Sequence, residues 1–138
     1  MVGLLVAVAV LALATIVGVA LRARSGRLRR SDRVTLPAGL PAVTPGAVTL
    51  LQFSSATCAP CRQVRAVCTA LAGELPGVHH VELDAEAHLD AVRQLEIWRL
   101  PTLLVVDGAG RVTRRAVGVP DRAQLALAVA AAQEAQHA

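Results

Sequence analysis

The chain has 138 residues, of which 54% are hydrophobic and 1% aromatic, and its formal net charge is +4. This length allows one domain of ordinary size with an appendage. With one Trp, one Phe and no Tyr, the sequence offers no evident aromatic-lined site for a small cofactor, and we expect none.

The N-terminal stretch predicts a transmembrane helix. Residues 2–21 are uncharged and apolar, and their only hydroxyl group belongs to Thr15. As a helix this run would rise about 30 Å, which matches the hydrocarbon core of a bilayer. A signal peptide or a buried core helix is the alternative. Signal peptides open with basic residues and have a shorter apolar stretch, so we favour a membrane anchor.

The positive charge is concentrated directly after this run. Six of the 14 basic residues lie from Arg22 to Arg33, where Asp32 is the sole acid. The rest of the sequence has eight basic residues and nine acidic ones. Such a cluster can bind nucleic acid or anionic lipid, but beside a membrane span its simpler role is to set topology. It predicts an N-terminus outside and a domain in the cytoplasm. An outward-facing domain is the alternative, and we expect no nucleic-acid partner.

Residues 22–43 have the composition of a basic juxtamembrane segment followed by a linker rich in proline and glycine, including Pro37, Gly39 and Pro41. This composition predicts a semi-extended spacer that holds the domain off the membrane surface. We expect no complete additional N-terminal strand and helix, because residues 34–44 are few and interrupted by proline. The folded domain is expected at residues 44–135.

From residue 44 onward, strand-like and helix-like segments alternate. Short apolar, β-branched runs predict strands, and apolar residues at helical spacing predict helices. The predicted strands are residues 47–53, 78–83, 103–106 and 111–117, and the predicted helices are residues 62–72, 88–95 and a last helix opening at 120–121. The order strand, helix, strand, helix, strand, strand, helix predicts an α/β fold with a mixed sheet flanked by helices.

Cys58 and Cys61 lie between the first predicted strand and the first predicted helix. At a helix start, unpaired N–H groups and partial positive charge stabilise a thiolate at Cys58. Such placement lowers a thiol pKa from about 8.5 into roughly the 3.5–7.5 range. Pro60 suits the first helical turn, where its missing N–H is no loss. The pair predicts thiol–disulfide exchange, with Cys58 as the attacking nucleophile and Cys61 as the resolving thiol.

Other roles for the cysteines are open. A static clip gains little entropic stabilisation from so short a loop. Structural zinc usually takes four ligands, and the sequence has no second Cys-x-x-Cys. His79 and His80 are interpreted as plain strand residues, because neighbouring side chains in a strand point to opposite faces. We therefore predict no metal site. Cys68 is interpreted as a small buried hydrophobic residue, with a second resolving thiol as the alternative.

Residues 44–132 resemble the thioredoxin family. The resemblance rests on Phe53, Thr57-Cys58-Ala59-Pro60-Cys61-Arg62, Leu100-Pro101-Thr102 and the turn Gly108-Ala109-Gly110-Arg111. It implies a minimal thioredoxin-like fold and a cis proline at Pro101 that faces the disulfide. It also implies that Leu100, Pro101 and Thr57 contact the substrate. Trp98, three residues before Pro101, either packs at the domain rim or lines a substrate groove.

Three positions depart from the family pattern. Thr57 stands where the family usually has Trp, and Ala59-Pro60 replaces Gly-Pro. Gln52 occupies the place of a buried Asp that accepts the proton of the resolving thiol. Glutamine cannot take a proton at neutral pH, so proton transfer would need water or another group. We expect Ala59, Pro60 and Gln52 to tune the reduction potential, within the span of about −270 to −120 mV seen in related oxidoreductases.

The sequence therefore predicts a membrane-anchored thiol–disulfide oxidoreductase that acts on protein disulfides or thiols. It also requires an electron donor, which the residues do not identify. Two alternatives are kept. The first is an outward-facing thiol reductase for cytochrome or envelope proteins. The second is a Cys-x-x-Cys module that senses redox state or delivers metal without turnover.

Overall fold

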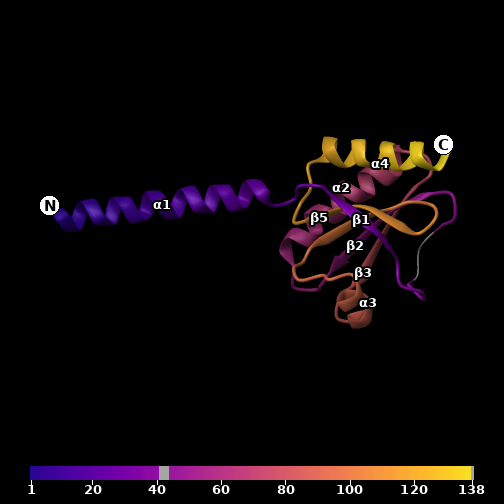
Figure 1. Cartoon of the computed structure of the whole chain (residues 1–138), viewed down its shortest axis with the longest axis horizontal. Helices are drawn as coiled ribbons and strands as arrows, with labels where there is room; N and C mark the ends of the chain where they lie inside the picture. The colour runs from indigo at the N-terminus through magenta and orange to yellow at the C-terminus, as the bar shows by residue number, and fades with distance from the viewer. Residues whose placement is uncertain (41–43, 138) are drawn as a thin grey trace.

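A long helix projects from an α/β domain in the computed structural model, which describes residues 1–40 and 44–137 (Figure 1). This helix, α1 (Val2–Arg24), has no buried residue. Among the described residues it is the one helix long and apolar enough to cross a bilayer, a test that an N-terminal signal sequence also passes. The predicted apolar helix is thus present, and its membrane role is taken up below.

The domain is built on a five-stranded mixed sheet in the order β1-β5-β4-β2-β3. The strands are β1 (Arg29–Thr35), β2 (Val48–Ser54), β3 (Val78–Asp84), β4 (Thr102–Val106) and β5 (Arg111–Val117). β2 and β3 run parallel, and the other pairings are antiparallel. Central β2 and β4 are buried along their whole length, which is why their sequences read as nearly continuous apolar runs.

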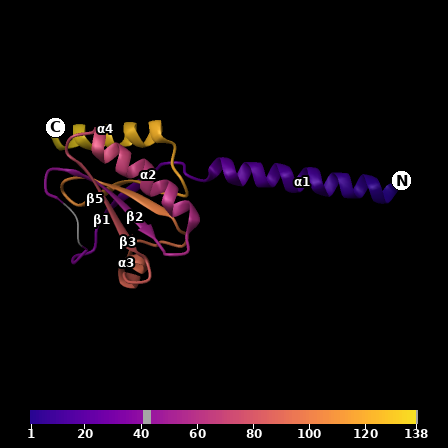
Figure 2. The same cartoon turned by 180° about the vertical axis from the view of Figure 1, so that it is seen from behind.

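Helices cover both faces of the sheet. α2 (Ala59–Glu74) and α4 (Arg122–His137) lie on one face, and α3 (Leu89–Gln94) lies on the other (Figures 1 and 2). Because side chains alternate along a strand, β2 contributes to two cores. Leu50 packs with the residues of α2 and α4, whereas Leu51 and Phe53 pack on the α3 side.

The predicted thioredoxin-like α/β fold is confirmed, including the order of elements from β2 to α4. The predicted helix boundaries differ from the observed ones by one to three residues. α2 begins at Ala59, three residues earlier than predicted, because Pro60 fits its first turn. α4 runs to His137, since its polar end remains a good helix former and Ala132 still packs on the core.

The predicted linker is wrong between residues 29 and 35, where the structure has the additional strand β1. β1 pairs with β5 as the edge strand of the sheet. An edge strand is held by backbone hydrogen bonds, so its arginine-rich sequence carries none of the apolar alternation from which strands are predicted. No helix connects β1 to β2 in the described residues of this stretch. Pro41, also assigned to the linker, lies outside the described residues.

The domain is joined closely to the end of α1 rather than held away from it. The Gly26 N–H donates to the Val117 carbonyl oxygen over 2.6 Å. A β-carbon at position 26 would lie 1.9 Å from the Val119 carbonyl oxygen, so only glycine permits this approach. Its φ of +76° is also one that glycine adopts readily.

Candidate active site

Cys58 and Cys61 form a disulfide at the N-terminus of α2, with 5.4 Å between their Cα atoms. Cys58 is the N-cap residue and is partly exposed, whereas Cys61 lies within the first turn and is 1% exposed. No acidic residue occupies the first turn, so the partial positive charge of the helix terminus is left available to a thiolate. The exposure difference makes Cys58 the thiol that an incoming disulfide can reach.

The residues expected to contact substrate lie at the same end of the sheet as Cys58, where β2 ends and β4 begins. The peptide bond between Leu100 and Pro101 is cis, and Pro101 is buried directly before β4. Because Thr102 pairs with Phe53, Pro101 lies beside the end of β2, from which the chain turns into the cysteine loop. Leu100 is partly exposed and Thr57 is exposed.

Trp98 is 88% exposed, so its side chain is not packed at the domain rim. It lines a shallow cavity together with Leu89 and Leu100. Since Leu89 is also exposed, this cavity offers an apolar surface next to the Pro101 loop.

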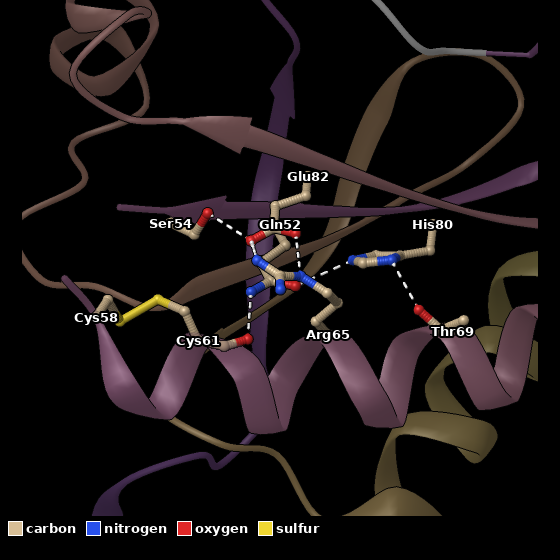
Figure 3. Close-up of polar contacts among 8 residues, drawn as sticks. All are labelled: Gln52, Ser54, Cys58, Cys61, Arg65, Thr69, His80 and Glu82. Atoms are coloured by element: carbon tan, nitrogen blue, oxygen red, sulfur yellow. Dashed lines mark hydrogen bonds and ion pairs between the residues drawn. A yellow bond between two sulfur atoms is a disulfide. The ribbon is translucent and has the colours of Figure 1, made fainter. Parts of the chain in front are cut away.

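Gln52 is fully buried and connects the cysteine helix to β3 (Figure 3). Its amide nitrogen donates to the Cys61 carbonyl oxygen over 2.8 Å, and its amide oxygen lies 3.0 Å from Nε2 of His80. Because the amide nitrogen already donates, the amide oxygen must accept, which assigns a hydrogen to His80 Nε2. Nδ1 of His80 can then accept from the Thr69 hydroxyl at 3.4 Å.

His80 is held as a neutral imidazole in this network. Burial lowers the pKa of His80 below its ordinary value of 6.5, and the Arg65 charge lowers it further, against an opposing effect of Glu82. The prediction treated His80 as a plain strand residue and so missed its contact with Gln52. No local sequence pattern indicated this contact, because it depends on the register in which β2 pairs with β3. In that register Leu50 lies opposite His80.

Glu82 lies two residues further along the same face of β3 and is ionised. Arg65 donates to it from Nε over 2.5 Å and from a terminal nitrogen over 2.8 Å, and the Ser54 hydroxyl donates over 2.7 Å. The hydrogen bonds from Arg65 lower the pKa of Glu82, and the one from Ser54 adds to this effect, while burial opposes them. Charge-assisted bonds of this kind hold a carboxylate in place. No pattern in the sequence marks Arg65 as a functional residue.

Cys68 is a free thiol in the core formed by α2 and the sheet. Burial, with a smaller contribution from Glu82, raises the pKa of Cys68 to about 12. A thiol that stays protonated cannot attack a disulfide, so the second resolving role does not fit this position. Within the described residues, no group of three or more His, Cys, Asp or Glu side chains is arranged to hold a metal ion.

The arrangement supports exchange of disulfide bonds. One sulfur is accessible at a helix N-terminus, its partner is buried one turn further on, and the cis proline lies at the adjacent strand. The fold and the site together define a thiol–disulfide oxidoreductase.

Comparison with known proteins leads to the same class. A family model described as Thioredoxin matches residues 43–131, and the chain belongs to the thioredoxin family. It is 34% identical over 76 residues to a thioredoxin of Chlamydia muridarum, covering 55% of this chain and 74% of the relative. Two solved structures share the fold. Chloroplastic thioredoxin z has a TM-score of 0.55 at 22% identity, covering 64% of this chain and 80% of its own. Fasciola hepatica thioredoxin has a TM-score of 0.54 at 23% identity, covering 63% and 82%.

Proposed function

We propose that this chain is a membrane-anchored oxidoreductase whose substrates are protein disulfides close to the membrane surface. α1 serves as the single span, Cys58 as the nucleophile and Cys61 as the resolving thiol. The observation that carries the proposal is that the redox pair and the end of α1 lie on the same side of the domain.

Two backbone hydrogen bonds connect the end of α1 to the active-site edge. The Gly26 N–H donates to the Val117 carbonyl oxygen over 2.6 Å, and the Gly118 N–H donates to the Pro101 carbonyl oxygen over 2.9 Å. Gly118 follows Val117 directly, so the path from α1 to the cis proline is short. A span ending here orients the active-site edge toward the membrane, which favours substrates displayed at that surface.

The reaction follows from the exposure of the two sulfurs. The Cys58 thiolate attacks one sulfur of a substrate disulfide, and the other substrate sulfur leaves as a thiolate that takes a proton from water. Cys61 gives its proton to water, and its thiolate attacks the Cys58 sulfur of the mixed disulfide and releases the second substrate thiolate, which takes a proton from water. The substrate gains two electrons, and the Cys58–Cys61 disulfide forms. A dithiol donor returns the pair to the reduced state by the same exchange.

Reduction of insulin disulfides by the full chain in detergent, with dithiothreitol as electron donor, tests this mechanism. We expect turnover by the wild type and loss of turnover to background in Cys58→Ser. Pre-reduced Cys61→Ser, mixed with insulin after the dithiothreitol is removed, should accumulate a mixed disulfide. Cys68→Ala is the matched control, because it removes a thiol that lies outside the redox pair, and it should retain turnover. Absence of turnover in the wild type would contradict catalysis and favour a non-catalytic Cys-x-x-Cys module.

A further inference from the structure

An arginine-rich cavity of about 750 Å³ lies where the end of α1 meets the sheet. Seven arginines line it, contributed by the end of α1, by β1 and the residues before it, by β5 and by the loop before Pro101. Among the described lining residues, Glu96 supplies the only carboxylate. A cavity of this size can admit a small ligand, and its excess of positive charge selects an anion.

The pairing of β1 with β5 opposes like charges across the sheet edge. Arg29 lies opposite Arg115, and Arg30 lies opposite Arg114. Like charges directly opposite each other destabilise a strand pair. None of these four side chains forms an ion pair within the described part of the chain. Arg29 and Arg115 both line the cavity, so an anion held there would remove the repulsion between them.

One of these guanidinium groups is fixed at the cavity wall. Arg115 donates to the carbonyl oxygens of Leu95 over 2.6 Å and Glu96 over 3.3 Å. A guanidinium held in this way offers its remaining N–H groups at a defined position. The planar fork of arginine matches phosphate oxygens in pairs, which makes arginine the preferred side chain for phosphate recognition.

The place of the cavity identifies the source of the phosphate. Leu21 and Arg22 of α1 form part of its wall, and α1 ends at Arg24. If α1 spans the membrane, as the proposed function states, this end lies at the level of the lipid headgroups, where basic residues are attracted to anionic lipid. The close approach of Gly26 to Val119 keeps the cavity at that level.

We propose that this cavity binds the phosphate headgroup of an anionic phospholipid. The inference rests on the proposed membrane span. The bound lipid neutralises the opposed Arg29 and Arg115 and holds the active-site end of the domain against the membrane. Arg99, which also lines the cavity, lies two residues before Pro101, so the lipid site and the substrate loop share a boundary.

The test uses the full chain in nanodiscs of equal parts phosphatidylcholine and phosphatidylglycerol, with retained lipids identified by native mass spectrometry. We expect the wild type to retain phosphatidylglycerol in preference to phosphatidylcholine. Each arginine near an anionic surface is worth about fivefold in binding, so R27Q/R29Q should lower this preference by roughly 25-fold. The control R93Q/R122Q removes the same charge from exposed positions outside the cavity and should leave the preference unchanged.

Three outcomes would overturn the lipid site. They are equal retention of both lipids by the wild type, an equal loss of preference in R93Q/R122Q, and displacement of the lipid by millimolar inorganic phosphate, which would assign the cavity to a soluble anion. Failure of the full chain to enter nanodiscs would instead overturn the membrane span together with the lipid site. Insulin reduction by R27Q/R29Q at the wild-type rate shows that the variant is folded and separates both results from the redox chemistry.

Discussion

At the scale of single residues, Gln52 changes how the buried side of the active site works. The sequence indicated only that a proton acceptor was missing. In the structure Gln52 binds the Cys61 carbonyl oxygen with one end of its amide and His80 with the other. A titratable imidazole is thereby linked to the backbone of the resolving cysteine through one side chain.

The lowered pKa of His80 predicts a pH-dependent stability. Because the folded-state pKa lies below the ordinary 6.5, the unfolded chain binds more protons as the pH falls through that value, and the free energy of unfolding decreases. Between about pH 8 and about pH 5.5, wild-type protein should lose more stability in urea denaturation than His80→Gln, which keeps an N–H donor and cannot titrate. Glu82 does not interfere, because its lowered pKa confines its effect to below 4.5.

His79→Gln is the matched control for this measurement, because His79 is exposed on the neighbouring position of β3. It should keep the pH dependence of the wild type. If His80→Gln and the wild type lose stability equally over this range, the buried neutral state of His80 is wrong.

At the scale of secondary-structure elements, the main difference from the prediction is β1, because residues expected to form a spacer are part of the sheet. Its position depends on the turn at Gly26, where the chain passes against the backbone of residues 117–119. A strand whose first five residues are all polar or charged is stable there because β5 supplies its hydrogen-bond partners.

Gly26→Ala should therefore destabilise the domain by more than about 1 kcal/mol, since its β-carbon would collide with the Val119 carbonyl oxygen. Gly73→Ala is the control. A β-carbon at position 73 of α2 meets nothing within 4 Å, so this change should stabilise by roughly 0.5–1 kcal/mol. Urea denaturation followed by circular dichroism measures both. Equal stability of Gly26→Ala and the wild type would show that the junction does not hold β1.

At the scale of the whole molecule, the arginine cluster that follows the apolar helix predicts a redox pair on the cytoplasmic side. After treatment with a permeant reductant, the accessible thiol of Cys58 should resist a membrane-impermeant maleimide in intact cells and react once the membrane is permeabilised. Cys68 should not contribute, because it is buried, and C58S/C61S provides the unlabelled control. Labelling of the wild type in intact cells would favour the outward-facing reductase instead.

The sequence by itself determined the apolar helix, the cysteine pair at a helix start and the order of elements from β2 to α4. These features are local, because the pattern of apolar side chains along consecutive residues indicates burial and helical spacing. The tertiary structure decided β1, the link from Gln52 to His80 and the arginine cavity. Each of these depends on which strands pair and in which register, and backbone pairing leaves no periodic signal in the side chains of an edge strand.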